Sequence, residues 1–117
     1  MRKTALAVAV VMWAGGHALA DPLSIDLPGA SSAERNTVDY SCTGGNKVTA
    51  EYVNAGANAL AIVTTIGQTI LMVSVMSGSG ARYAGQQFVW WTKGNKADFY
   101  DLTKGEDAPP EFSCEAT

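Results

Sequence analysis

Histidine is almost absent from this sequence, and its scarcity limits the chemistry that the chain can perform. The 117 residues contain one histidine, His17, which lies within the first twenty residues. If that segment is removed after export, the remaining 97 residues contain no histidine. Ser-His and Cys-His nucleophile pairs and histidine-ligated metal sites are then excluded. We therefore expect no enzyme activity, no metal site and no cofactor.

Long apolar runs are also missing outside the N-terminus. Two basic residues precede an apolar run at residues 5–14, and the small-residue sequence Ala-Leu-Ala ends at residue 20. This pattern predicts a secretory signal peptide, residues 1–20, with the mature chain starting at Asp21. The first later cysteine is Cys42, so no cysteine is placed for lipid attachment. We expect a soluble periplasmic protein with no stable membrane anchor.

Positive charge is the scarcer sign in the exported part of the chain. From Asp21 onward six basic residues oppose eleven acidic residues, which gives a net charge of −5. A surface that binds phosphate backbones needs clustered lysine and arginine, so nucleic acid is not an expected partner. The negative charge favours a cationic macromolecule instead.

Cysteine is limited to Cys42 and Cys114. Two cysteines in an exported chain predict an intramolecular disulfide. A structural role is favoured, because redox pairs usually have the spacing Cys-x-x-Cys. Closing a loop of this length stabilises a fold by roughly 4 kcal/mol through chain entropy alone.

Helical periodicity is missing as well, and short β-prone segments separated by glycines take its place. Polar residues and glycines interrupt the uncharged stretch 52–81, so it does not predict a membrane span. We expect an extended leader at 21–36, a folded domain at 37–117, and a type II′ turn at Gly67-Gln68. Strands are predicted at 37–42, 47–53, 60–66, 69–76, 81–84, 87–92, 97–102 and 111–114. Such close spacing favours a small antiparallel barrel or sandwich.

Adjacent tryptophans and a pair of aspartates are candidates for binding or catalysis. On a strand, Trp90 and Trp91 point to opposite faces, so one is expected in the core and the other nearer solvent. An exposed tryptophan would suit an alternative function, a small β-barrel that binds a cell-wall glycan or a small apolar ligand. Asp98 and Asp101 are not expected to form a catalytic pair, because positions three apart on a strand face opposite sides.

Two motifs close together in the sequence carry a family resemblance. Residues 77–83 read Ser-Gly-Ser-Gly-Ala-Arg-Tyr, and residues 91–94 read Trp-Thr-Lys-Gly. With Tyr40-Ser41-Cys42 near the start of the domain and Cys114 near its end, this arrangement resembles the membrane-bound and periplasmic inhibitors of c-type lysozyme. The resemblance covers about residues 38–114. It implies an eight-stranded antiparallel β-barrel that is not an enzyme and whose protein partner is c-type lysozyme.

The resemblance also implies the residues that contact lysozyme. In this family the serine of the first motif and the lysine of the second enter the lysozyme cleft and contact its catalytic carboxyl groups; here they are Ser79 and Lys93. Gly80, Tyr83 and Gly94 belong to the same motifs and complete the expected binding set, with Tyr83 as a loop support or contact. Lysozymes of this class are typically basic, which matches the acidic chain. The periplasmic branch is favoured, and both a monomer and a homodimer remain open.

Overall fold

The computed structural model describes residues 22–30 and 32–117. The predicted signal peptide, residues 1–20, and its cleavage position lie outside the described residues. Residues 22–30 contain a turn at 28–29 and no helix or strand. Within the described part of the chain, no helix has the length and apolar character needed to cross a membrane.

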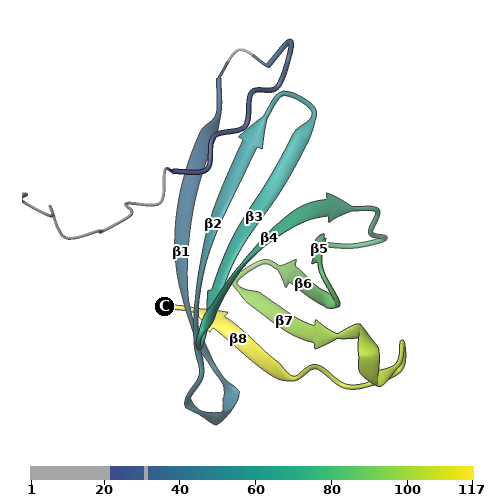
Figure 1. Cartoon of the computed structure of the whole chain (residues 1–117). Coiled ribbons are helices and arrows are strands. Elements are labelled where there is room, and N and C mark those ends of the chain that lie inside the picture. Colours follow the sequence, from purple (N-terminus) through teal and green to yellow (C-terminus); the bar gives the residue numbers. More distant parts are fainter. Residues whose placement is uncertain (1–21, 31) are drawn as a thin grey trace, which may run out of the picture.

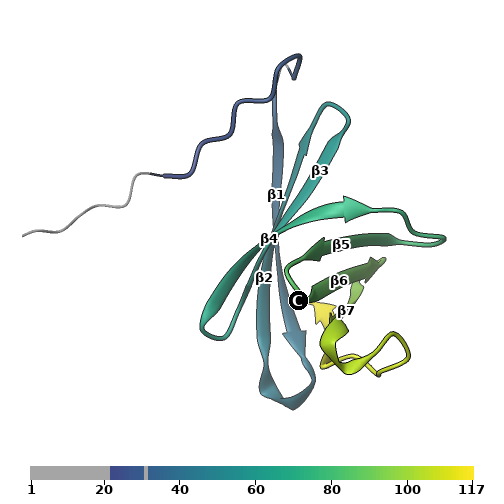
Figure 2. The same cartoon turned by 45° about the vertical axis from the view of Figure 1, so that its right-hand side comes forward.

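Eight antiparallel strands form a closed barrel in which each strand pairs with its neighbours in the sequence, and β1 pairs with β8. Figures 1 and 2 show the longer strands β1–β4 on one side and the shorter strands β5–β8 on the other. This confirms the all-β, eight-stranded barrel. The strands are β1 (Glu34–Cys42), β2 (Lys47–Ala55), β3 (Asn58–Thr65), β4 (Gln68–Val75), β5 (Ala81–Gly85), β6 (Phe88–Lys93), β7 (Lys96–Asp101) and β8 (Phe112–Ala116).

The connections between strands alternate between the two ends of the barrel, because successive strands run in opposite directions. One end carries the connections at residues 56–57, 76–80 and 94–95. We call it the motif end, because the loops of both sequence motifs lie there. The distal end carries residues 43–46, 66–67, 86–87 and 102–111, which include the short 3-10 helices η1 (Thr43–Gly45) and η2 (Leu102–Lys104). Both sequence motifs that carry the family resemblance therefore place their loops at the same end.

The barrel interior is filled by the inward-facing residues of the strands, and the largest of them is Trp90. Trp90 is completely buried, and Tyr40 packs edge-on against it with ring centroids 5.1 Å apart. The Trp90 indole N–H donates to the Tyr52 hydroxyl at 2.9 Å, which compensates for its removal from water. Seven other described side chains have exposures of 0–1%, and all but one lie on β2, β3 and β4: Val48, Ala50, Ala61, Val63, Ile70, Met72 and, on β6, Val89.

The disulfide lies where the barrel closes. Cys42 of β1 and Cys114 of β8 are register partners with Cα atoms 4.0 Å apart, and their sulfur atoms are bonded. Just beyond β8, the backbone N–H of Thr117 donates to the carbonyl oxygen of Asp39 at 3.0 Å. The predicted disulfide is thus confirmed, and it fixes the first strand covalently to the last.

The turn between β3 and β4 differs from the sequence-based prediction by one residue. Thr65 pairs with Gln68, so the two central residues are Ile66 and Gly67. Gly67, with φ +79°, occupies the second central position, whereas a type II′ turn requires positive φ at the first. The predicted Gly67-Gln68 turn is therefore wrong. The β-branched Ile66 is typical of a strand, so the sequence-based prediction placed it in β3, whereas it is the first central residue of the turn.

Strand β1 begins at Glu34, three residues before the expected start of the folded domain at Thr37. Glu34 pairs with Asn54, and Arg35 forms an ion pair with Glu51 on β2. The polar sequence of this segment contains little β propensity. Pairing with the long strand β2 therefore extends β1 to Glu34, beyond the strand at 37–42 that the sequence predicts.

Candidate functional site

The two motifs meet where β5 pairs with β6. Ala81 and Thr92 are register partners, so the loop before β5 lies against the end of β6. Gly80 has φ +65°, and a Cβ there would collide with the carbonyl oxygen of Thr92 and lie 2.8 Å from Cγ of Lys93. Only glycine allows this approach. The Gly80 of the first motif thus brings Ser79 next to the Lys93 of the second.

The loop at residues 76–80 is held by hydrogen bonds to one backbone oxygen. The Ser79 carbonyl accepts from the Ser77 hydroxyl at 2.5 Å and from the indole N–H of Trp91 at 2.9 Å. The Ser79 side chain is exposed, and no hydrogen bond within the described part of the chain uses its hydroxyl. The backbone at Ser79 is therefore fixed while its hydroxyl stays available to a partner.

Lys93 is positioned by the same indole ring. Its ammonium nitrogen lies 4.6 Å from the centre of the Trp91 ring, within the range of a cation–π interaction. The Arg82 guanidinium carbon lies 5.7 Å from that ring centre. The two ion pairs found among the described residues involve Arg35 and Lys104, so neither uses Lys93. Lys93 thus presents an uncompensated positive charge beside the Ser79 loop.

The turn after Lys93 is tight and adds a second cation. Lys93 pairs with Lys96 across the two-residue turn Gly94-Asn95. Gly94 has φ +58° at the first central position, the sign that a type II′ turn requires there. Lys96 in turn is the register partner of Glu115 on β8, so a carboxylate lies beside the second lysine.

Tyr83 points into the barrel. Its side chain is buried, and its ring centroid lies 5.7 Å from that of Tyr52. Burial raises the pKa of both tyrosines, so their hydroxyls stay neutral at physiological pH. Both tyrosines, together with Gly94 and Asn95, line a cavity of about 360 Å³ beneath the motif end. The expected role of Tyr83 as a loop support or contact stays a prediction.

The remaining candidates occupy the positions that strand geometry predicts. Trp90 is in the core, whereas Trp91 is half-buried on the outside. Asp98 is the register partner of Trp91 on the outer face of β7. Asp101 lines a cavity at the distal end with the inward-facing Phe99. The two carboxylates therefore face opposite sides of β7 and do not form a pair.

Comparison with known proteins identifies the family. Residues 40–108 match the sequence profile of the family described as membrane-bound lysozyme-inhibitor of c-type lysozyme. The chain belongs to this family. Two relatives bear the name membrane-bound lysozyme inhibitor of C-type lysozyme. The Pseudomonas aeruginosa relative is 40% identical over 89 residues, 75% of this chain and 70% of the relative. The Cupriavidus necator relative is 35% identical over 116 residues, 98% of this chain and 90% of the relative.

A solved structure of a family member has the same fold. The crystal structure of Pseudomonas aeruginosa MliC in complex with hen egg white lysozyme aligns with a TM-score of 0.68 and 36% sequence identity. The alignment covers 80% of this chain and 94% of the MliC chain. The family resemblance inferred from the two motifs is thus confirmed, and a lysozyme-bound member shares the barrel of this inhibitor-family protein.

Sequence reasoning named Trp91 as a candidate but did not predict its contacts at the motif end, and it did not single out Met76. Trp91 contacts both Ser79 and Lys93. Its contact with Lys93 could have been predicted from the sequence, because residues two apart on a strand share one face. Met76 is 94% exposed at the start of the 76–80 loop. Exposed methionines are common at binding surfaces, because the side chain is flexible and polarizable. The sequence feature that could have indicated Met76 is its position, as an apolar residue directly before the Ser-Gly-Ser-Gly sequence.

Proposed function

We propose that this chain is an inhibitor of c-type lysozyme that acts by binding and not by catalysis. In this mechanism Ser79 and Lys93 enter the active-site cleft of the lysozyme together. The observation that carries the proposal is the shared contact with Trp91, which joins the backbone of Ser79 to the ammonium group of Lys93. Family membership supports the same function, since the related MliC is bound to hen egg white lysozyme in its crystal structure.

The two side chains suit the chemistry of a glycoside hydrolase. Such enzymes use two carboxyl groups on either side of the scissile bond, one as the acid and one as an ionised carboxylate. The Lys93 ammonium pairs with an ionised carboxylate, and the Ser79 hydroxyl donates to or accepts from the other carboxyl group. Neither side chain offers a glycosidic bond. Occupation of the cleft therefore blocks the substrate without any reaction.

Preorganisation explains how so small a site can bind tightly. The Ser79 loop is held by hydrogen bonds at its backbone, and Gly80 fits against β6 with no space for a side chain. Lys93 is at the end of a paired strand and rests on an aromatic ring. Because these groups are already ordered, little conformational entropy is lost when the partner binds.

Charge distribution supports the same partner. From Asp21 onward the net charge is −5, which attracts a basic protein over long distances and speeds association. At the motif end, Lys93 forms no ion pair within the described residues, and its positive charge suits a carboxylate of the lysozyme cleft. The overall charge thus favours encounter, and the local charge favours this one orientation.

We also propose that the inhibitor acts in the periplasm, where it meets lysozyme that has crossed the outer membrane. The signal-peptide pattern at residues 1–20 and the disulfide both fit an oxidising, exported location. Intact mass measurement of the protein from a periplasmic extract tests this. A chain that begins at Asp21 supports the proposal, and a chain that retains residues 1–20 contradicts it.

Titration of lysozyme activity tests the function itself. Purified inhibitor is added to a c-type lysozyme, and the clearing of a bacterial cell suspension is followed. We expect inhibition that saturates at one inhibitor per lysozyme and weakens as substrate concentration rises, as competition for the cleft requires. Undiminished activity with an excess of folded protein at micromolar concentration would contradict the proposed function for that lysozyme.

A further inference from the structure

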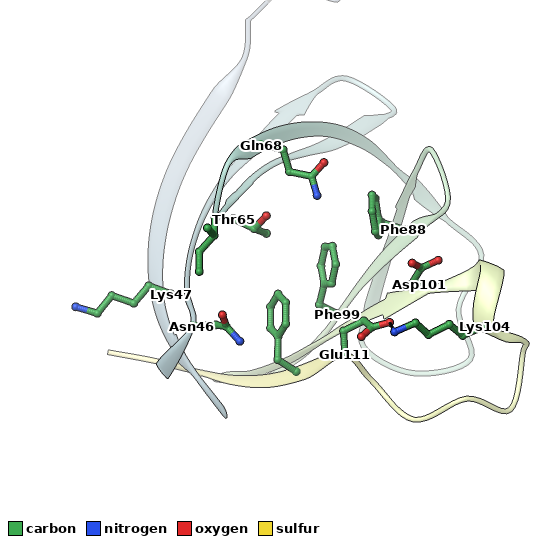
Figure 3. A pocket seen from close by; sticks show the side chains of 11 residues that line it. Asn46, Lys47, Thr65, Gln68, Phe88, Phe99, Asp101, Lys104 and Glu111 are labelled. Atoms are coloured by element: carbon green, nitrogen blue, oxygen red, sulfur yellow. Dashed lines mark ion pairs between the residues drawn. The ribbon is translucent and has the colours of Figure 1, made fainter. Parts of the chain in front are cut away.

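A second cavity opens at the distal end of the barrel, away from Ser79 and Lys93. Its volume is about 410 Å³, which lies in the range of roughly 300–1,000 Å³ found for small-molecule sites. Figure 3 shows its lining, which comes from the ends of strands on both sides of the barrel. A lysozyme bound at the motif end leaves this cavity free, so it requires a separate explanation.

One wall of the distal cavity is a ladder of three phenyl rings (Figure 3). Phe99 stacks on Phe112 with centroids 4.8 Å apart and planes 4° from parallel. Phe88 stacks on the other side of Phe99 at 5.0 Å and 29°. The rings come from β6, β7 and β8, and because Phe99 is stacked between the other two, its edge rather than its face lines the cavity. This wall is apolar and suits the apolar part of a ligand better than a charged group.

The facing side of the cavity is mainly polar, and it also includes one isoleucine and one lysine. Gln68 and Thr65 extend from the β3–β4 hairpin toward the phenyl rings, and Asn46 lies at the lower edge (Figure 3). Asn46 donates to the Thr43 carbonyl at 3.1 Å, which leaves its amide oxygen available. Amide and hydroxyl groups in this arrangement both donate and accept hydrogen bonds. An apolar ligand would leave them desolvated and unpaired.

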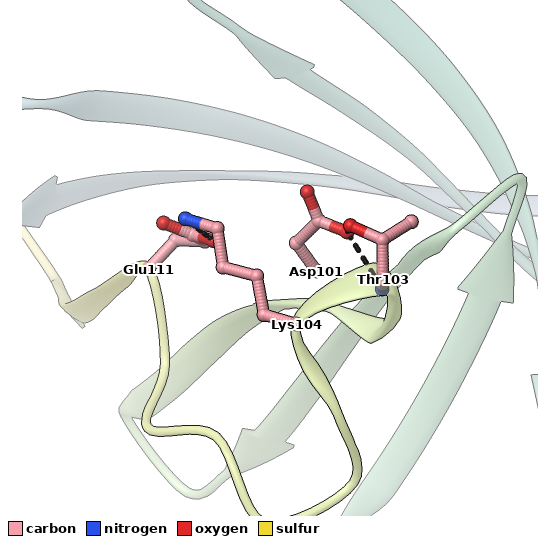
Figure 4. A network of polar contacts seen from close by, with 4 residues as sticks. All are labelled: Asp101, Thr103, Lys104 and Glu111. Atoms are coloured by element: carbon pink, nitrogen blue, oxygen red, sulfur yellow. Dashed lines mark hydrogen bonds and ion pairs between the residues drawn. The ribbon is translucent and has the colours of Figure 1, made fainter.

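Asp101 adds one fixed carboxylate to the distal cavity. Its Oδ1 atom accepts from the backbone N–H of Thr103 at 2.9 Å and from the Thr103 hydroxyl at 2.6 Å (Figure 4). These hydrogen bonds lower the pKa of Asp101, so the group is ionised. No hydrogen bond within the described residues uses Oδ2. Beside it, Lys104 and Glu111 neutralise each other as an ion pair (Figure 4).

We propose that the distal cavity binds a neutral saccharide. A sugar ring has an apolar face of C–H groups and a rim of hydroxyls, which correspond to the phenyl ladder and to the polar side of the cavity. Two of its hydroxyls donate to Asp101 Oδ2 and to the Gln68 amide oxygen. Lys47 extends away from the cavity (Figure 3), and Lys104 pairs with Glu111, so Asp101 supplies the remaining charge among the lining residues and disfavours an anionic ligand.

A titration without lysozyme tests this proposal. The ¹⁵N-labelled protein is titrated with triacetylchitotriose, a neutral trisaccharide, and amide shifts are followed by NMR. We expect saturable shifts at Gln68, Phe99 and Phe112, with a Kd at or below about 10 mM. Shifts confined to the motif end, or none at all, would overturn the proposal. Decanoate replaces the sugar in a second titration, and binding of decanoate alone would also overturn it.

Two variants and a matched control locate the sugar. Gln68→Ala and Asp101→Asn are each expected to weaken binding by roughly threefold to tenfold, because each loses one hydrogen-bond acceptor for a ligand hydroxyl. Gln87→Ala is the control, since Gln87 is exposed at the same end but does not line the cavity. Equal binding by Gln68→Ala, Asp101→Asn and Gln87→Ala would contradict the site. All three variants should inhibit lysozyme like the wild type, which separates this proposal from the proposed function.

Discussion

The indole N–H of Trp91 donates a hydrogen bond of 2.9 Å to the backbone carbonyl of Ser79. The same ring carries the Lys93 ammonium at 4.6 Å, so one side chain positions both residues that are proposed to enter the lysozyme cleft. Trp91 is itself on the strand, where pairing with Arg82 and Asp98 fixes its backbone. The relative position of Ser79 and Lys93 therefore depends on a residue that need not touch the lysozyme catalytic groups.

Trp91→Phe is expected to weaken inhibition by roughly fivefold. The variant keeps an aromatic face beneath Lys93 but loses the donor to Ser79, a hydrogen bond worth about 1 kcal/mol. Trp91→Ala also loses the cation–π contact and should weaken inhibition further. Inhibition constants of both variants, with circular dichroism to confirm folding, check this. Wild-type inhibition by folded Trp91→Ala would show that Trp91 has no positioning role.

Gly80→Ala is expected to disturb the site, and Gly78→Ala is its matched control. A Cβ at Gly80 meets the Thr92 carbonyl oxygen and requires a strained φ of +65°, whereas a Cβ at Gly78 has nothing within 4 Å. We expect Gly80→Ala to cost about 1–3 kcal/mol of unfolding free energy and to weaken inhibition. Gly78→Ala should change stability by less than about 0.5 kcal/mol. Urea unfolding and inhibition titrations measure both, and similar results for the two variants would contradict the close packing at Gly80.

Loss of the disulfide between Cys42 and Cys114 is expected to lower the Tm by roughly 15–30 °C. Loop closure contributes about 4 kcal/mol, and each kcal/mol corresponds to about 4–8 °C in a domain of this size. Scanning calorimetry of the oxidised protein and of the Cys42→Ala/Cys114→Ala double variant checks this. An unchanged Tm would mean that the β1–β8 pairing closes the barrel without covalent help.

Alkaline pH is expected to destabilise the fold through the buried tyrosines. Burial raises the pKa of Tyr52 above its ordinary value of 10.0, and Tyr83 shifts in the same direction. Unfolded tyrosines ionise near pH 10, so the unfolded chain binds fewer protons than the folded chain above that pH. Stability is therefore complete below about pH 10 and falls at higher pH, by up to about 1.4 kcal/mol per pH unit for each tyrosine.

Urea unfolding between pH 8 and pH 11 measures this dependence. Tyr52→Phe removes one of the ionising groups, so its unfolding free energy should fall less steeply above pH 10 than that of the wild type. Thr49→Val, on the outer surface of β2, provides a control that should keep the wild-type slope. Identical slopes for the wild type and Tyr52→Phe would contradict the assignment.

Much of the fold follows from the sequence because the β signal is local. Alternation at Val48 and Ala50 places them on one face of a strand, and both are buried. The adjacent tryptophans predict that one enters the core and the other does not, and the structure shows that Trp90 is the buried one. The turn at Ile66-Gly67 was misplaced because a glycine with positive φ fits more than one position in a tight turn. The start of β1 depends on pairing with β2, which local sequence does not encode.

The site is predictable only through the motif resemblance. Composition and spacing lead to a small acidic barrel, but they do not distinguish Lys93 from the other surface lysines. The convergence on Trp91 depends on the pairing of β5 with β6, because Ser79 and Trp91 are twelve residues apart in the sequence. The distal cavity depends likewise on Phe88, Phe99 and Phe112, which three different strands bring together.

Inhibition by Lys93→Ala, compared with Lys47→Ala, is the most direct test of the proposed mechanism. Both lysines are exposed, but Lys93 is at the motif end and Lys47 is at the distal end. Removing one partner of a desolvated ion pair costs about 2–5 kcal/mol, so Lys93→Ala should raise Kd roughly 30-fold to several thousand-fold. Lys47→Ala should leave Kd nearly unchanged at the same ionic strength. Equal inhibition by the two folded variants would contradict insertion of Lys93 into the lysozyme cleft.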